Sequence, residues 1–422
     1  MIKNDYGRLG CPYYQERLEN GVYVYFIPRH SKLKSATVYI NKGTLLSAPV
    51  VNSMKIPQGV SYYLANSILS KEIIHDFSKK GVMSKVDVDY SYTAFSLTTF
   101  AENSLFSCLE KLMERISTPC VSEEEVNAFR ESDQKRMEEE ANDPILLSQK
   151  RVLDDLYFVS PLAHPVYPNE EEAKNLHAST LRKFQELYYV PQRVVLFISV
   201  DNDPRETIKL VKKLRFPKPL TILEEPNKKE EDYTKVKEEY VVIDSEDNSS
   251  YLSYGIKFAC RHNIFDAYGE AMFFMYENLT KILFEKNHDF ISGIADLKSD
   301  LVSCRFLQGG EDATILLTFR TDTPEEIVHF MSNYLTKVSK YAKSKLYDQL
   351  KEEYYAQAMK TLSSPHLVVD AFARAYPNHI SYTSLVAHTM RLSSSVFKHF
   401  LEDIRQFRRS ACYCKKPEVD HV

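Results

Sequence analysis

The sequence predicts an α+β protein built from two related halves, each an antiparallel sheet packed with helices. Its 422 residues exceed the roughly 250–300 at which a single hydrophobic core stops growing. Strand-like runs alternate with amphipathic helical patterns, and the segment 312–335 repeats the strand, polar turn and helix of the segment 92–116. We therefore expect one domain at 1–226 and a second at 227–422, with a boundary near Asn227 in the charged stretch 224–239.

Composition and charge describe an ordinary globular protein and exclude several classes. Hydrophobic residues make up 44% of the chain and the net charge is only -4, which argues against a nucleic-acid footprint or a basic membrane-binding face. No run approaches the roughly 18 apolar residues needed to cross a bilayer, and no apolar leader opens the sequence. The seven scattered cysteines are typical of free thiols in a reducing compartment. We expect a cytoplasmic location.

The first half opens with two runs that predict strands. Val22–Arg29 and Ala36–Gly43 are rich in β-branched and aromatic residues and end in turn residues. We expect them to be neighbouring antiparallel strands.

The stretch 58–72 predicts a helix, because apolar residues recur in it every four positions. These residues are Val60, Leu64 and Ile68. Tyr62, Ala65 and Asn66 lie off this buried stripe. No ionisable side chain other than tyrosine occurs between Gln58 and Ser70.

The rest of the first half alternates strands and helices. Tyr90–Phe100 alternates as a strand and precedes an amphipathic helix. Ser122 and Glu125 have the spacing of a capping box, which predicts the start of a long charged helix that ends near Pro144. A helix over Glu170–Tyr188 then leads into an apolar strand.

Three stretches together resemble a known family. "LENGVYVYFIPR", the long run Ser160–Asp201 and "ANDP" at Ala141–Pro144 follow its motifs in order and spacing. The chain resembles the insulinase/pitrilysin zinc peptidases, in the short two-domain bacterial form related to mitochondrial processing peptidase. The resemblance implies the insulinase/LuxS-like metallopeptidase fold across nearly the whole chain.

At the zinc motif the chain departs from that family. Active members read Gly-Val/Thr-Ala-His-Phe-Leu-Glu-His, with two histidines that bind zinc and a glutamate that activates water. Here Tyr62 and Asn66 stand at the histidine positions, Ala65 replaces the glutamate, and the family's spacing places Arg136 at the third ligand. Asparagine is a poor zinc ligand and tyrosine titrates near about pH 10. We therefore expect no catalytic residues, no bound metal and no cofactor.

A second family feature is also missing. The resemblance implies an arginine and a tyrosine, seven residues apart in the second domain, that clamp the substrate backbone. Phe284 and Ile291 occupy these positions. The chain therefore departs from both the zinc-bearing and the clamp-bearing pattern.

We expect one family property, the binding of extended peptide, to survive these losses; the alternative is an internal strand without a ligand. In the family, substrate peptide adds as a strand to an edge strand of the first sheet, and the matching segment here is Gly81–Ser91. The candidate peptide-binding residues are Ser84, Lys85, Val86, Asp87 and Val88.

Other candidates have plainer explanations. His399–Asp403 resembles the zinc motif but lies in an ordinary amphipathic helical pattern near the end of the chain. Cys412–His421 is interpreted as a terminal strand with two free thiols, and His164 as a positional residue.

Three functions remain open. The chain is a non-catalytic peptidase homologue that pairs with an active zinc-peptidase subunit to enclose peptide, an active zinc metalloendopeptidase with substituted ligands, or a scaffold subunit without a peptide role. For the first, the expected partner is a second family subunit, in a hetero- or homodimer. Neither a nucleic acid nor a membrane is expected as a partner.

Overall fold

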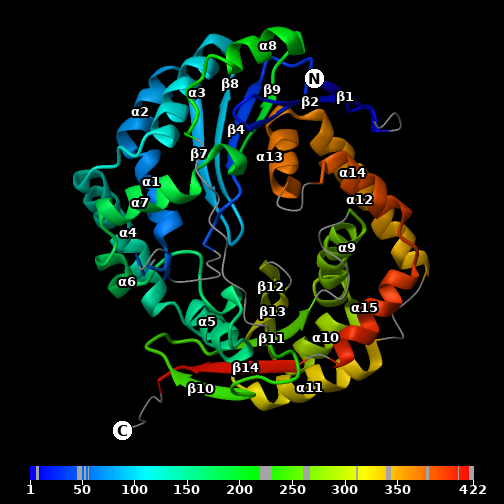
Figure 1. Ribbon diagram of the computed structural model, residues 1–422. Helices are drawn as coiled ribbons and strands as arrows, with labels where there is room; N and C mark the ends of the chain where they lie inside the picture. Colours follow the sequence, from blue (N-terminus) through cyan, green and yellow to red (C-terminus); the bar gives the residue numbers. More distant parts are fainter. Residues whose placement is uncertain are drawn as a thin grey trace. The chain divides into compact units, whose positions relative to one another are not determined.

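The computed structural model describes most of the chain. The described residues are 1–5, 9–44, 50–51, 54–55, 57–218, 231–259, 267–309, 312–338, 344–376, 380–406 and 408–417. Helices and sheets combine throughout, which confirms the α+β class (Figure 1).

Contacts divide the chain into two compact units, and neither is a continuous half of the sequence. Unit 1 comprises Met1–Gln134, Val166–Lys228 and Tyr355–Val386; unit 2 comprises Lys135–Pro165, Lys229–Tyr354 and Ala387–Val422. Each unit thus includes a segment from the other half. The boundary between related halves at 226/227 stays a prediction, and Asn227 lies outside the described residues.

The sheet of unit 1 has seven strands among the described residues, in the order β1-β2-β3-β9-β4-β8-β7. They are β1 (Ile2–Asn4), β2 (Tyr13–Arg17), β3 (Tyr23–Phe26), β4 (Lys34–Ile40), β7 (Val82–Val88), β8 (Thr93–Thr99) and β9 (Val194–Ser199). Only β3 and β9 pair in parallel. The short strands β5 (Val50–Val51) and β6 (Met54–Lys55) form a separate pair.

The prediction that the first two strand runs are neighbours was wrong. β3 and β4 overlap those runs, but β9 lies between the two strands. Every residue of β9 is buried, and so continuous an apolar run favours a central position, where both faces of the strand are covered. A strand from late in the unit therefore takes the middle of the sheet.

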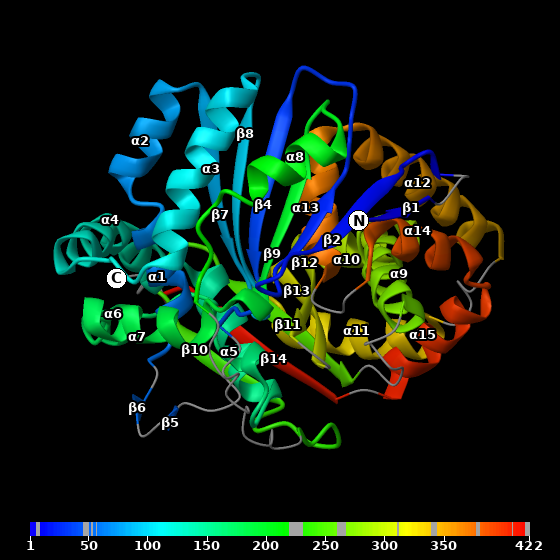
Figure 2. The ribbon, with the colours of Figure 1, turned by 45° about the horizontal axis from the view of Figure 1, so that its top comes forward.

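Helices cover both faces of this sheet. Figures 1 and 2 show α2 and α3 on one side and α13 on the other. The helices of unit 1 are α1 (Val60–Ile68), α2 (Lys71–Lys79), α3 (Glu102–Ser117), α6 (Glu170–Lys174), α7 (Ala178–Tyr188), α8 (Pro204–Val211), α13 (Pro365–Ala375) and the short η3 (Pro191–Arg193). Helices α4 (Glu123–Asn142), α12 (Ser344–Ser363) and α14 (Tyr382–Arg391) belong in part to each unit.

Local signals for helix starts were mostly correct. Ser122 and Glu125 form the predicted capping box, with hydrogen bonds of 3.0 and 3.2 Å. The helix expected over Glu170–Tyr188 is instead two helices, α6 and α7. Arg130 donates to the carbonyl oxygens of Ala173 and Leu176 at the break, and so satisfies backbone groups that a continuous helix would have used.

The sheet of unit 2 repeats the arrangement of unit 1. Its order is β10-β14-β11-β13-β12, and only β10 and β14 pair in parallel. This matches the run β3-β9-β4-β8-β7 strand for strand, and confirms the predicted repeat of strand, turn and helix. The elements are β10 (Tyr240–Asp244), β11 (Tyr251–Ala259), β12 (Asp300–Gly309), β13 (Asp312–Arg320), β14 (Arg408–Lys415), α5 (Pro144–Leu156), α9 (Ala267–Phe284), α10 (His288–Asp296), α11 (Pro324–Lys337), α15 (Ser395–Gln406) and η2 (Pro161–Ala163).

The two halves exchange equivalent helices. Helix α5, from the first half, packs on β11 and β14 of unit 2, whereas α13, from the second half, packs on β4 and β9 of unit 1. Both helices begin with a proline, Pro144 and Pro365, at the position where a missing N–H is tolerated.

The polar contacts of α13 involve a cross-strand pair of unit 1. Thr37 on β4 lies opposite Ser96 on β8, and their hydroxyl oxygens are 2.9 Å apart. Both hydroxyls lie within hydrogen-bond distance of Oδ1 of Asp370, at 3.4 and 3.1 Å. Asp370 is the fifth residue after Pro365.

Helix α5 makes the equivalent contacts in unit 2. Ser253 on β11 lies opposite Thr318 on β13, with 3.1 Å between their hydroxyl oxygens. Gln149, the fifth residue after Pro144, donates to Thr318 at 2.9 Å. The internal repeat thus extends to single side chains.

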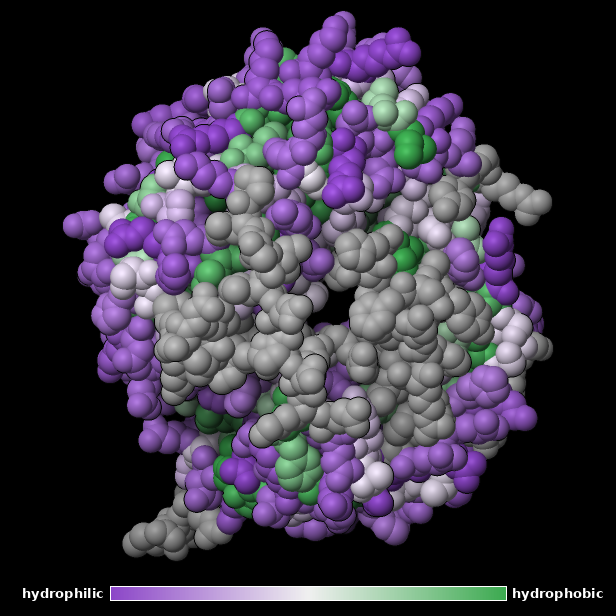
Figure 3. All heavy atoms as spheres, viewed as in Figure 1, coloured by the Kyte–Doolittle hydropathy of each residue, from purple (hydrophilic) through white to green (hydrophobic). Residues whose placement is uncertain are grey.

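The outer surface of the helical layer of unit 1 is polar. Figure 3 shows mainly hydrophilic residues over α2 and α3, and α2 buries only Ile73 and Phe77. Within the described part of the chain, no helix combines the length and apolar character that a membrane crossing requires.

Candidate functional site

Helix α1 carries the degenerate motif, and a glycine fixes where it starts. Gly59 caps the helix with φ of 77°. This left-handed backbone conformation is strained for any residue that has a Cβ, but not for glycine. A Cβ at this position would also lie 2.3 Å from Cδ of Pro168. The Gly59 position therefore admits glycine alone, and it sets the register of the residues that follow.

Tyr62, at the first histidine position, belongs to an aromatic cluster. Its ring lies 5.5 Å from that of Phe129 and 6.2 Å from that of Tyr167. Its hydroxyl donates to Oδ1 of Asp133 at 3.3 Å, and Asp133 is buried. Phe129 and Asp133 are four residues apart on α4, so both face α1.

Ala65 and Asn66 have no donor set for a metal. The expectation that Ala65 lies off the buried stripe was wrong, since it is fully buried; almost all of α1 is covered, apart from Tyr62 and Asn66. Asn66 is half-buried, and its side-chain amide donates to the Tyr62 carbonyl oxygen one turn earlier, at 2.8 Å.

Arg136, at the predicted third ligand position, is engaged within its own helix. Its guanidinium lies 2.6 Å from Oε2 of Glu140, one turn further along α4. Arginine is cationic at any physiological pH and cannot bind zinc.

Zinc does not fit these residues. Zinc in peptidases is bound by histidine nitrogens and carboxylate oxygens. Here Tyr62 offers a phenol that donates to a carboxylate, Ala65 a buried methyl group, and Asn66 an amide that donates to a carbonyl oxygen. Within the described ranges, no group of three or more His, Cys, Asp or Glu side chains is arranged to hold a metal ion.

The predicted peptide-binding strand lies at a sheet edge. β7 is the last strand of the unit 1 sheet among those described, and it pairs with β8 alone. Because alternate residues of an edge strand direct their N–H and C=O groups away from the sheet, β7 offers the main-chain pattern that an added strand requires.

The side chains of β7 differ between its two faces. Lys85 and Asp87 lie opposite Ser96 and Ala94, on the face that α13 covers. Asp87 accepts a hydrogen bond from the Tyr92 hydroxyl at 3.2 Å. Burial, followed by the charge of Asp87, raises the pKa of Tyr92 well above its ordinary value, so the phenol stays protonated.

The remaining predicted residues of β7 are partly shielded. Ser84, Val86 and Val88 are half-buried. Because side chains alternate along a strand, they lie on the face that packs against α2 and α3, whereas Met83 and Lys85, on either side of Ser84, are exposed. The structure thus gathers Ser84–Val88 on one edge, apart from the residues of the degenerate motif on α1.

The residues at the clamp positions are apolar, and only Phe284 is packed in the core. Phe284 ends α9 in the core of unit 2, 5.1 Å from the ring of Phe290 and 6.1 Å from that of Tyr334. Ile291 is exposed on α10. Neither side chain can hydrogen-bond to a peptide backbone.

The remaining candidates, His399–Asp403, Cys412–His421 and His164, fit the structural roles expected for them where the structure describes them. His399 and Glu402 are exposed on α15, whose Phe400 and Leu401 are buried. Cys412 and Cys414 are buried in strand β14, and burial raises the pKa of Cys412 to about 12. His164 is exposed after η2, and His421 lies outside the described residues.

Sequence reasoning missed the partners of Tyr62. The sequence does predict that Phe129 and Asp133 share one face of the charged helix, because they are four residues apart. What the sequence could not show is which helix that face meets.

Comparisons with known proteins agree with the fold. No family model matches the chain. An uncharacterized zinc protease, YmfH of Bacillus subtilis, is 26% identical over 257 residues, and the match spans 58% of each chain. The chain thus spans less than two thirds of the curated relative it matches.

Solved structures match over nearly the whole chain. An M16-like peptidase from Alicyclobacillus acidocaldarius has a TM-score of 0.81 at 13% identity, covering 97% of this chain and 99% of that one. A structure described as a peptidase M16 inactive domain, from Pseudomonas fluorescens, has a TM-score of 0.75 at 14% identity, covering 96% and 98%. The periplasmic protease PqqL of Escherichia coli has a TM-score of 0.72 at 13% identity, and this chain covers only 48% of it.

These likenesses agree with the motifs in the sequence and with the repeated sheet topology. The chain has the fold of these M16-like peptidases, and its sequence is similar to that of the zinc protease YmfH over 257 residues.

Proposed function

We propose that the chain is a non-catalytic peptidase homologue that pairs with an active zinc-peptidase subunit. The observation that carries this proposal is the packing around α1, where the Tyr62 ring, its bond to Asp133 and the buried Ala65 replace ligands and general base. A site that had lost only one ligand would keep the others in place. Here all the motif positions have become packing or hydrogen-bonding positions.

The size of one relative supports pairing. This chain matches 48% of PqqL, so that protein has room for a second region of similar length. A chain that has only one region of this length could gain the second by binding another chain of the same fold. The partner in this proposal carries an intact His-x-x-Glu-His motif and supplies the zinc.

The role of this subunit is to hold extended peptide at β7 by strand addition. Main-chain hydrogen bonds need no particular side chains, so the loss of zinc does not remove this capacity. Location in the cytoplasm is part of the same proposal.

The decisive experiment is to mix the chain with each family member of its own cell that keeps the intact motif. Light scattering should give a 1:1 complex that cleaves peptide faster than the partner alone. A chain that stays monomeric beside all of them would refute the pairing.

Zinc content separates this proposal from an active enzyme with substituted ligands. Protein purified without metal, then incubated with zinc and desalted, should hold well below one equivalent in elemental analysis. One tightly held zinc per chain would favour the active enzyme, whereas recovery in a complex without any peptidase would favour a scaffold.

A further inference from the structure

The segment that joins the two halves is fastened to unit 2. We call residues 231–239 the strap. The Lys237 N–H donates to the Asp155 carbonyl oxygen at 2.7 Å, and its ammonium lies 2.9 Å from Asp154. The Tyr233 hydroxyl hydrogen-bonds to Asp312 at the start of β13. The strap is therefore tied to the end of α5 and to the sheet, although its composition is that of a solvated linker.

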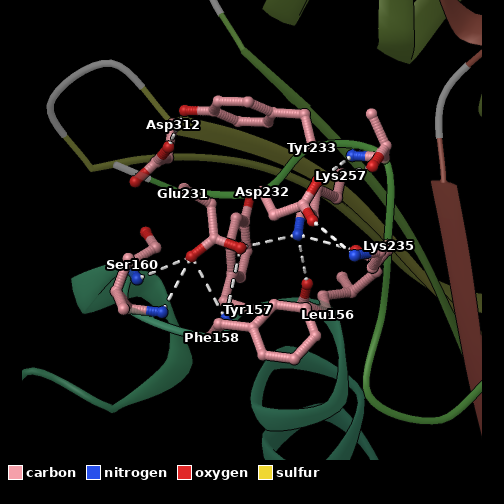
Figure 4. Close-up of polar contacts among 12 residues, drawn as sticks. Leu156, Tyr157, Phe158, Ser160, Glu231, Asp232, Tyr233, Lys235, Lys257 and Asp312 are labelled. Atoms are coloured by element: carbon pink, nitrogen blue, oxygen red, sulfur yellow. Dashed lines mark hydrogen bonds and ion pairs between the residues drawn. The ribbon is translucent and has the colours of Figure 1, made fainter. Parts of the chain in front are cut away.

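A buried lysine lies at the centre of these contacts. Lys257 on β11 is 0% exposed. Its ammonium donates to Oε1 of Glu231 at 2.7 Å, to the Leu156 carbonyl oxygen at 2.7 Å and to the Lys235 carbonyl oxygen at 3.0 Å (Figure 4). All three of its hydrogen-bond donors are thus used.

Aromatic rings complete the surroundings of this ammonium. It lies 5.2 Å from the ring centroid of Tyr157 and 5.5 Å from that of Phe158, within the range of cation–π attraction. The ring centroid of Tyr233 is 5.9 Å away, so the Lys257 charge is held by one carboxylate, two carbonyl oxygens and three rings.

Glu231 connects the lysine to the segment after α5. Its side chain is 3% exposed, and its carboxylate accepts the N–H groups of Phe158, Val159 and Ser160 at 3.1, 2.8 and 3.1 Å. One carboxylate therefore joins the strap, the end of the exchanged helix α5 and, through Lys257, strand β11.

Such a pair is an inefficient way to gain stability. Removing two charges from water costs several kcal/mol, and an apolar pair of similar volume is often as stable. Breaking it on one side, by contrast, leaves a buried charge without its partner. The pair therefore acts mainly to select one arrangement of the three segments over others.

We propose that Glu231 and Lys257 form a latch that fastens the strap to the segment after α5, and that opening it releases residues 158–160 and the strap together while the sheet stays folded. This inference is independent of the proposed function, since it concerns no partner, metal or peptide. The amides of Phe158, Val159 and Ser160 are direct reporters, because Glu231 accepts their hydrogen bonds.

The test is amide hydrogen exchange on the full chain with Glu231→Gln. Exchange at residues 158–160 should accelerate by about tenfold or more, while the amides of β11 and β13 change by less than about threefold. Unchanged exchange at 158–160 would overturn the latch. Equal acceleration in β11 and β13 would also overturn it, because the pair would then support the sheet rather than the strap.

A double variant covers the case in which the single variant fails to fold. Glu231→Leu with Lys257→Met removes both charges, so the fold should be kept, but leucine accepts no hydrogen bond and exchange at 158–160 should remain fast. Exchange as slow as in the unchanged protein would overturn the proposal.

The matched control is Lys235→Gln, which removes an exposed charge from the same strap. Lys235 pairs with Asp232 at 3.4 Å in solvent, and its carbonyl oxygen, which Lys257 uses, is unaffected. Exchange at 158–160 should not change. An acceleration equal to that of Glu231→Gln would show that the total charge of the strap, and not the buried pair, controls its attachment.

Discussion

Ala65 shows what restoring the zinc motif would cost the fold. The side chain is fully buried on α1, so Ala65→Glu would place a methylene group and a carboxylate in a packed site. We expect a loss of about 3 kcal/mol or more in the free energy of unfolding, from overpacking and desolvation. Denaturant unfolding measures this loss.

Asn66→His is the control for that substitution. Asn66 is half-buried, so its replacement should change the free energy of unfolding by about 1 kcal/mol or less. If Ala65→Glu were as well tolerated as Asn66→His, α1 would have kept the space of an active site, and the non-catalytic proposal would lose its main support.

Glu231 predicts a dependence of stability on pH. Burial raises the pKa of its carboxyl, but the hydrogen bonds from Lys257 and from the N–H groups of Val159 and Phe158 outweigh burial, and the net pKa lies below its ordinary value of 4.5. The carboxylate therefore stabilises the fold fully above about pH 5, and this contribution is lost as the pH falls through the lowered pKa.

Thermal unfolding between pH 6 and pH 3 tests this dependence. The unchanged protein should lose more stability over that range than Glu231→Gln, which has no carboxyl to protonate. Asp155 affects both proteins equally: burial raises the pKa of its carboxyl despite Arg151, so its protonation favours the fold as the pH falls. Parallel curves for the two proteins would contradict the role given to Glu231.

Among the elements, those with strong local signals could be predicted. The buried stripe of α1, the capping box at Ser122 and the repeat of β8–α3 in β13–α11 all follow from patterns within a few turns of chain. The insertion of β9 between β3 and β4 could not be predicted, since it joins strands far apart in sequence. For the same reason, the hydrogen bond between Tyr62 and Asp133 and the burial of Glu231 in a charged linker could not be predicted from the sequence.

Asp370 allows a test of how helix α13 is held. Asp370→Ala removes the acceptor shared by Thr37 and Ser96, of which Thr37 is buried. We expect a loss of about 1–3 kcal/mol in the free energy of unfolding, because a buried hydroxyl would lose a partner.

The control lies one turn further along α13. Arg374 is 65% exposed, and its guanidinium is 3.8 Å from Asp87, so Arg374→Ala should cost little, as exposed ion pairs do. Equal effects of the two substitutions in denaturant unfolding would show that α13 is held by its apolar face alone.

Strand β7 gives the test of peptide binding. Val86→Pro removes one backbone N–H and bends the edge, so we expect weaker binding of extended peptide, or slower cleavage by the partner, with the complex intact. Met83→Ala is the control, because Met83 is 74% exposed and its backbone N–H remains. Binding that survives Val86→Pro but falls in Met83→Ala would mean that a side chain, and not the strand edge, contacts the peptide.

For the whole molecule, the exchange of α5 and α13 predicts that neither half folds alone. A fragment of residues 1–226 lacks α13, which covers β4 and β9, and keeps α5 without the strands it packs on. The exposed apolar surface should make it aggregate. Co-expression with residues 227–422 should give a soluble 1:1 complex by size exclusion with light scattering.

A monomeric 1–226 fragment with a cooperative thermal transition would contradict this expectation. A second fragment, 1–226 followed through a flexible linker by residues 355–386, provides the control, since it regains α13. It should be more soluble than 1–226 alone if the missing helix is the cause.

The exchanged helices also change the kinetic order of assembly. Two separate chains, each with one half, could complete their sheets only by meeting, and dilution would separate them. Within one chain the same event is intramolecular, and its effective concentration, about millimolar for a short flexible connection, is fixed by the length of the connecting segment. Folding of this protein should therefore follow first-order kinetics and be independent of dilution, although each sheet is completed by a helix from the other half.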